Sequence, residues 1–413
     1  MKFLTVMFLL ILGSYPIEDL RLDTFDLLVP APSLIFALIL ITLTHHALVM
    51  RRNDVLFSVD PKLIALSVLL GGLLTMSTIG AGAVSRCDAV TFDNLKWIPY
   101  IIGFPLLATI LSRLSERVMW IALLVACMIT VILGYYRFVF LEGGIQAEHL
   151  LGYWGIRYTP ATRNSDVLYP LVAAILSVGL ISNASSQTIR ALLTITASLS
   201  ITAVVLTQSR SGWIALLVAA VTMYWTAFRP LRSKKVSIVW PLLAIVVPLV
   251  IVTSLPEQYS DLLLSRAKTI LGVEQEVGEA SNVERMERYT SVVRVMASNP
   301  LGIGVGNFSC AVGETDIEVK HAENAYLTLT IEGGWVAGMS FIAILLYLFQ
   351  RLRKQEQSRR TSGGQVGGIP ETLLVALATY FLFNDEVNSL FVWSLLSVVG
   401  SVIPRRQLVT ARL

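Results

Sequence analysis

Residues 320–350 read KHAENAYLTLTIEGGWVAGMSFIAILLYLFQ. After a polar opening the stretch is apolar almost without interruption, and it is longer than the roughly 20 residues that a helix needs to cross a bilayer. A carboxylic acid, Glu332, lies inside the apolar part. This stretch predicts a membrane helix with a polar head, and a charge that lies within the membrane is expensive enough to need a reason.

The rest of the chain has the same character. It has 413 residues, of which 55% are hydrophobic and 15% charged, whereas soluble proteins carry about 25% charged residues. The mean hydropathy is +0.70. We therefore predict an all-α polytopic membrane protein, in which the N-terminal run is a first helix and not a signal peptide. Twelve apolar segments are expected as spans, at residues 3–17, 27–50, 63–84, 97–112, 118–140, 167–183, 191–208, 212–228, 236–254, 325–350, 370–384 and 388–404.

The charges orient these segments. Most basic residues fall in short loops on one side, as in 229–235 and 351–360, and most acids fall on the other side. Since short cytoplasmic loops are enriched in Lys and Arg, we expect both termini in the cytoplasm. We divide the chain into 1–190 with six helices, 191–350 as a core with one large outer loop at 255–323, and 351–413 with a cytoplasmic loop and the last two helices. The outer face then carries most of the polar residues, so recognition or chemistry is expected there.

Inside the large loop, residues 281–298 predict an amphipathic helix. Ser281 and Glu284 have the spacing of a capping box, and an apolar stripe recurs at helical spacing at Met286, Tyr289, Val293 and Met296. Arg285 and Arg288 lie one turn apart on another face. The alternating Gly302, Gly304 and Gly306 that follow favour a tight turn over a nucleotide loop, because no strand precedes them and no Gly-Lys-Ser/Thr follows.

Two further features carry polar chemistry. On a helix, His321, Asn324, Thr328 and Glu332 would share one face and form a polar stripe. Glu332 is then either a structural partner between helices or a functional group. Arg210, which lies between Ser209 and Ser211 in a tight outer turn, favours an anion over a purely snorkelling role.

Three ordered pieces, SRSGW at 209–213, NPLGIGVGNF at 299–308 and HAENAYLTLTIEGGWVAG at 321–338, resemble the O-antigen ligase and Wzy-type O-antigen polymerase superfamily. The resemblance is good over about residues 190–350. It implies a GT-C-like helical fold in the bacterial inner membrane, with the active site facing the periplasm. It also implies metal-independent transfer of a glycan from an undecaprenyl-diphosphate carrier to an acceptor hydroxyl of a glycan or of lipid A-core.

The resemblance also implies roles for single residues. Arg210 and Arg285, with Arg288 beside the latter, would bind the diphosphate, His321 would be the catalytic base, and Asn324 would match the family's asparagine. Glu332 matches the family's acid before the glycine and is expected to be structural. Many members have histidine directly before the asparagine, where this chain has Glu323, so either His321 or Glu323 is the base.

Ligase and polymerase share this set of residues, and both stay open. Two other classes of membrane protein are alternatives. A transporter or flippase often has two similar halves, whereas the large loop here occurs once. A metal-dependent GT-C glycosyltransferase could use Glu18 and Asp19 as metal ligands, although acids gather on the outer side in any case. We expect no cofactor, no metal site and no nucleic-acid partner.

Overall fold

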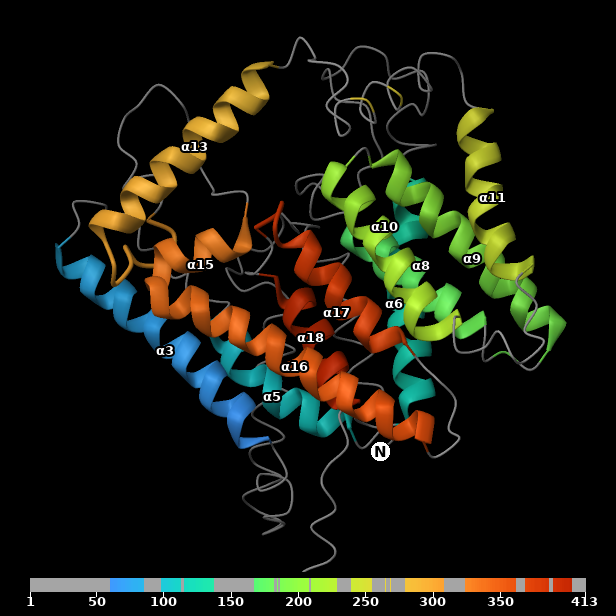
Figure 1. Ribbon diagram of the computed structural model, residues 1–413, viewed down its shortest axis with the longest axis horizontal. Helices are drawn as coiled ribbons and strands as arrows, with labels where there is room; N and C mark the ends of the chain where they lie inside the picture. Colours follow the sequence, from blue (N-terminus) through green and yellow to red (C-terminus); the bar gives the residue numbers. More distant parts are fainter. Residues whose placement is uncertain are drawn as a thin grey trace, which may run out of the picture. The chain divides into compact units, whose positions relative to one another are not determined.

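The computed structural model describes residues 60–84, 98–112, 115–136, 167–181, 184, 186–207, 209–228, 239–254, 264, 268, 279–307, 324–361, 368–385 and 389–402. All regular structure in these ranges is helical (Figure 1). The predicted segments 3–17 and 27–50 lie outside the described residues. The expected all-helical class is confirmed for the part that the structure describes.

The chain folds as two compact units. The first contains α6 (Glu116–Tyr136), α8 (Leu168–Ile181), α9 (Gln187–Leu206), α10 (Arg210–Met223) with a π-turn at Tyr224–Phe228, α11 (Val239–Thr253) and α17 (Ile369–Tyr380). In this unit α8 packs against α9, α10, α11 and α17. Close approach depends on small residues, since a Cβ added at Gly179 would lie 2.4 Å from Cγ1 of Ile369.

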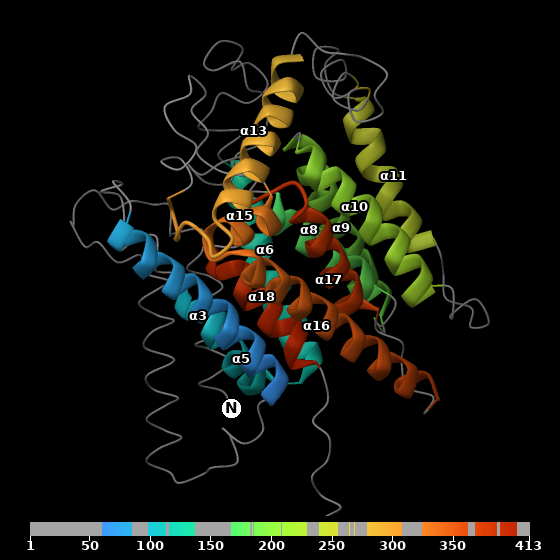
Figure 2. The same cartoon turned by 60° about the vertical axis from the view of Figure 1, so that its left-hand side comes forward.

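The second unit contains α3 (Pro61–Val84), α5 (Ile98–Leu111), α13 (Glu279–Ser298), α15 (Ala325–Gly333), α16 (Trp335–Thr361) as far as Gln355, and α18 (Leu390–Ser401). Here α5 packs against α3 and α18, and α15 packs against α3 and α13 (Figure 2). Aromatic rings fill the core between these elements. The Trp393 ring lies 5.4 Å from Phe104 and 6.1 Å from Phe341, measured between centroids.

Four described helices are long and apolar enough to cross a membrane, namely Pro61–Gly80, Glu116–Tyr136, Gln187–Leu206 and Trp335–Ser358. Their surfaces expose large apolar side chains, and Met76 and Met339 are 70% and 67% exposed. Water would penalise such surfaces, whereas lipid tails cover them without cost. The protein is therefore a helical membrane protein. The number of twelve spans and the outer position of the large loop remain predictions.

Most predicted segments that fall on described residues coincide with a helix to within a few residues. The prediction of one helix over 325–350 is wrong, because the helix is interrupted at Gly334. That residue has φ 82° and ψ 172° and ends α15 before α16 begins. Backbone in this region is open almost only to glycine. The nine-residue α15 is therefore a separate element, and it carries the polar end of the quoted stretch.

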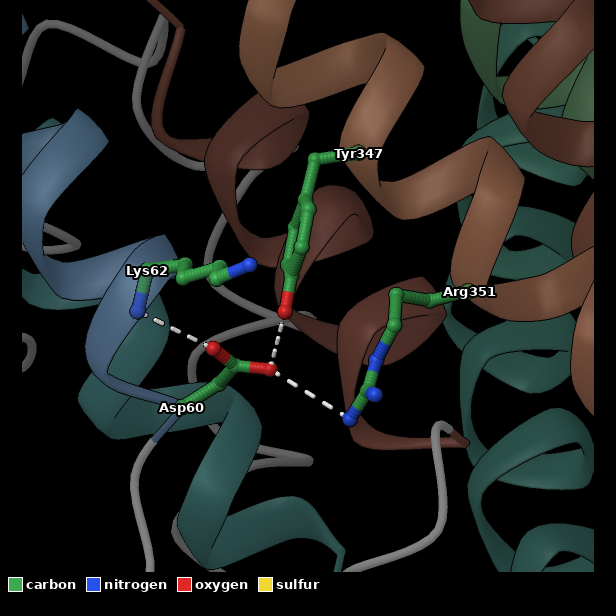
Figure 3. Close-up of polar contacts among 4 residues, drawn as sticks. All are labelled: Asp60, Lys62, Tyr347 and Arg351. Carbon is green, nitrogen blue, oxygen red and sulfur yellow. Dashed lines mark hydrogen bonds and ion pairs between the residues drawn. The ribbon is translucent and has the colours of Figure 1, made fainter.

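The N-terminal end of α3 is tied to α16 by a polar cluster (Figure 3). Asp60 accepts a hydrogen bond from the backbone N–H of Lys62 at 3.0 Å. Its other carboxylate oxygen accepts from the Tyr347 hydroxyl and pairs with Arg351 at 3.4 Å. The carboxylate thus caps one helix and neutralises a cation of another, which fixes where α3 begins relative to α16.

Candidate functional site: the head of α15 and its glycine turn

Asn324 caps α15. Its backbone is extended, and its side-chain oxygen accepts hydrogen bonds from the N–H groups of Tyr326 and Leu327 at 3.0 and 3.1 Å. Its amide nitrogen donates to the Leu382 carbonyl at 2.9 Å. The helix therefore begins at Ala325. The expected stripe of four polar residues on one continuous helix is wrong in this respect, since Asn324 lies before the first helical residue. His321 and Glu323 lie outside the described residues.

Next to Asn324, the turn that follows α17 holds the first residue of α15. The Ala325 N–H donates to the carbonyls of both Phe381 and Asn384 at 3.0 Å. The free N–H groups of a helix start need such acceptors. The head of α15 is thus fixed from both sides, by its own cap and by this turn.

At the other end of α15, Glu332 is buried, with 7% of its surface exposed. Its carboxylate accepts a hydrogen bond from the Gly306 N–H at 2.9 Å. The predicted structural role assumed a partner on a neighbouring helix, but the partner found is the backbone of the glycine turn. A buried carboxylate is tolerated only where hydrogen bonds replace its hydration.

Residues 302–306, which we call the glycine turn, form a tight turn, as expected. Gly302, Gly304 and Gly306 all have positive φ, at 89°, 83° and 77°. A Cβ at Gly302 would lie 2.4 Å from the Glu332 carbonyl oxygen, so no larger residue fits there without movement. The turn lies directly against the end of α15, where the Ile303 N–H donates to the Ile331 carbonyl at 2.9 Å and the Gly304 N–H to the Glu332 carbonyl at 3.0 Å.

Two hydroxyls of α3 complete the contact. Ser77 donates to the Glu332 carbonyl at 2.6 Å and accepts from the Gly304 N–H at 2.9 Å. Thr78 accepts from the Val305 N–H at 3.0 Å. Neither residue was expected at the site from the sequence, since a serine and a threonine in an apolar helix usually bond to a carbonyl of the same helix. The only signal was that the two hydroxyls are adjacent in an apolar segment.

The amphipathic helix predicted at 281–298 is confirmed as α13, Glu279–Ser298. Its buried face is formed by Val292, Val295 and Met296, which pack with Ile303 of the glycine turn and Ile331 of α15. Val293, which the predicted stripe included, is 61% exposed. For Arg285 and Arg288 the structure describes the helical backbone and not the side chains.

Arg210 is the first residue of α10 in the first unit, and it is partly buried. Its neighbours in the SRSGW stretch have structural roles. The Ser209 hydroxyl caps the helix by accepting from the Gly212 N–H at 3.4 Å and lies 2.7 Å from the Ser211 hydroxyl. The Trp213 indole N–H donates to the Val204 carbonyl of α9 at 3.2 Å. These hydrogen bonds fix the start of α10 and hold it against α9.

A cation at this position opposes the helix dipole, which favours negative charge at a helix N-terminus. The arginine and the helix start would both be stabilised by an anion. Arg210 belongs to a different unit from α13 and α15, so its expected place beside Arg285 and His321 stays a prediction.

Among the residues that the structure describes, no three His, Cys, Asp or Glu side chains lie close enough together to hold a metal ion. Glu18 and Asp19, the ligands considered for a metal-dependent enzyme, lie outside these ranges.

Comparison with known families supports the resemblance. Residues 195–364 match the family model described as O-antigen ligase. The match runs from α9 to the end of α16 and so includes the Arg210 turn, α13, the glycine turn and α15. No curated protein shows significant similarity to the chain. Residues 195–364 are thus similar to the O-antigen ligase family, and this similarity and the helical membrane fold together support a membrane enzyme of glycosyl transfer in polysaccharide synthesis.

Proposed function

We propose that the protein transfers a glycan from an undecaprenyl-diphosphate carrier to an acceptor hydroxyl at the periplasmic face of the bacterial inner membrane, without a metal ion. The observation that carries the proposal is the family match over residues 195–364. The matched segment contains both the arginine turn and the fixed head of α15.

The chemistry needs two kinds of group. The acceptor oxygen attacks the anomeric carbon, the bond from that carbon to the diphosphate oxygen breaks, and the hydroxyl proton passes to a base. Guanidinium groups bind phosphate oxygens in a bidentate manner and stabilise the charge of the leaving diphosphate. In the proposal Arg210 and Arg285 have this role, with Arg288 as the neighbouring alternative to Arg285.

The base is His321 or Glu323, both of which lie just before the Asn324 cap in sequence. Histidine titrates near neutral pH, which suits a general base. Asn324 already donates and accepts three hydrogen bonds within the protein. We propose that it holds the preceding residues in place for the acceptor, a role that its position as helix cap supports.

Deletion of the gene in the source bacterium tests the function. Loss of surface glycan, with full-length polymer left on the lipid carrier, indicates a ligase for lipid A-core. Surface glycan reduced to single repeats indicates a polymerase. Unchanged surface glycan and no accumulation of lipid-linked intermediates would refute the proposal.

Substitution in the complemented strain tests the base. His321→Ala should reduce transfer at least about a hundredfold, the scale for loss of a general base, with the protein still inserted at normal levels. Glu323→Ala is the matched comparison. If only Glu323→Ala abolishes transfer, the base lies two residues further along, and if neither variant reduces transfer, the mechanism is wrong.

A further inference from the structure

Four consecutive backbone N–H groups of the glycine turn, those of residues 303 to 306, all donate hydrogen bonds out of the turn. The Ile303 N–H binds the Ile331 carbonyl. The Gly304 N–H is shared between the Glu332 carbonyl and the Ser77 hydroxyl. The Val305 and Gly306 N–H groups bind the Thr78 hydroxyl and the Glu332 carboxylate. A turn that merely reversed the chain would satisfy some of these groups internally or with water.

The acceptors come from two separate elements. Ser77 and Thr78 belong to α3, and Glu332 lies in the last turn of α15, 255 residues away in sequence from Ser77. Ser77 joins them directly, because its hydroxyl donates to Glu332 and accepts from Gly304. The three side chains and the end of α15 together form what we call the turn clamp.

The clamp fixes α13 as well, because α13 runs straight into the turn. The Asn299 N–H donates to the Val295 carbonyl, and the Gly302 N–H donates to the Asn299 carbonyl, both at 3.0 Å. The Trp335 N–H, at the start of α16, binds the Pro300 carbonyl at 3.3 Å. Val292, Val295 and Met296 of α13 form one core with Ile303 and Ile331. A shift of the turn would therefore move the last turns of α13.

We propose that Ser77, Thr78 and Glu332 are positioning residues, which hold the glycine turn and thereby place α13, with its arginines, relative to the head of α15. This inference rests on the proposed function, in which α13 and the residues before α15 serve one reaction. None of the three side chains needs to touch substrate in this role. Since a misplacement of about 1 Å can cost about a hundredfold in rate, loss of the turn clamp should slow glycan transfer.

The two hydroxyls should differ in importance. Val305 is 2% exposed, so its N–H would be left buried without its hydroxyl acceptor in Thr78→Val, a loss that favours local opening by about tenfold or more. In Ser77→Ala the Gly304 N–H keeps the Glu332 carbonyl, and we expect a change of about threefold. Thr75 supplies a matched control, because its hydroxyl binds the Gly71 carbonyl of its own helix at 2.8 Å.

Hydrogen exchange of the full-length protein in nanodiscs, read by mass spectrometry, measures the clamp without any substrate. Peptides that cover 300–307 should exchange about tenfold faster in Thr78→Val, about threefold faster in Ser77→Ala, and at the unaltered rate in Thr75→Val. Thr78→Ser keeps the hydroxyl and should restore slow exchange. Unchanged exchange in both Ser77→Ala and Thr78→Val would overturn the inference.

Complementation of the deletion strain, at matched protein levels, connects the clamp to transfer. Ser77→Ala combined with Thr78→Val should lower surface glycan at least about threefold, and Thr78→Ser alone should support normal levels. Faster exchange with normal glycan in the double variant would show that the clamp does not position the reaction, and the proposed function would still stand. If deletion itself leaves the glycan unchanged, it is the proposed function that fails, and the exchange result stands on its own. If the double variant does not insert into the membrane, hydrogen exchange and surface glycan of the Ser77→Ala single variant test the inference instead.

Discussion

Replacement of Gly334 by alanine is the sharpest test of the break between α15 and α16. At φ 82° and ψ 172° a residue with a Cβ costs about 1 to 3 kcal/mol. That Cβ would also lie 2.6 Å from the Pro300 carbonyl oxygen and 2.8 Å from the Leu301 carbonyl carbon, which are backbone atoms that cannot rotate away. The backbone at Pro300 would have to move away to relieve this contact. That movement would break the hydrogen bond from the Trp335 N–H to the Pro300 carbonyl, which is worth about 1 kcal/mol.

These contributions amount to about 3 kcal/mol. At about 2 °C per kcal/mol for a large chain, Gly334→Ala should lower the apparent melting temperature by about 6 °C. The measurement is tryptophan fluorescence of the detergent-solubilised protein at one fixed heating rate, because membrane proteins often unfold irreversibly. Gly72→Ala is the matched control, since nothing lies within 4 Å of a Cβ there and alanine favours a helix by about 1 kcal/mol. Equal melting of Gly334→Ala and the unaltered protein would refute the account of the break.

The remaining predictions concern other contacts. Asp60→Asn should destabilise the protein by about 1 kcal/mol through loss of the Arg351 pair, measured by the same melting assay, while Lys62→Gln should have no effect because only the Lys62 backbone contacts Asp60. Gly212→Ala should lower the melting temperature, since its Cβ would lie 2.3 Å from Cγ2 of Val167, and Val167→Ala in the same chain should recover part of the loss. Arg210→Lys should reduce surface glycan at normal protein levels because lysine lacks the planar fork, whereas Arg294→Lys, on the exposed part of α13, should not; normal glycan in Arg210→Lys would remove its role at the diphosphate.

The positions of most described helices could be predicted because the bilayer imposes a simple rule. An apolar run of sufficient length has to be helical to satisfy its backbone, and α3, α6 and α9 follow that rule. The amphipathic α13 could be predicted from its 3.6-residue period, although the period alone placed the exposed Val293 on the buried face. Hydropathy thus gives the elements but not which atoms they present to one another.

The head of α15 shows why the rest could not be predicted. Asn324 fits helical spacing with Thr328 and Glu332, but asparagine is also among the best helix caps, and spacing alone cannot separate the two roles. The break at Gly334 depends on a single backbone conformation, which the adjacent Gly333 could equally have adopted. Ser77 and Thr78 are separated from their partners by more than 200 residues, and no local pattern marks such a contact.

Glu332, the carboxylic acid in an apolar segment, has a structural function at the junction of α15 and the glycine turn. A helix end leaves carbonyls without partners, and a glycine turn leaves N–H groups without partners, so the two can satisfy each other. At α15 the carbonyls of Ile331 and Glu332 accept from Ile303 and Gly304, but the turn still has the Val305 and Gly306 N–H groups to place. Thr78 and the Glu332 carboxylate take them. The side chain of Glu332 accepts its hydrogen bond from the turn, so the acid stabilises the turn. A glutamine would supply the same acceptor, so Glu332→Gln should retain the turn, whereas Glu332→Leu should release it.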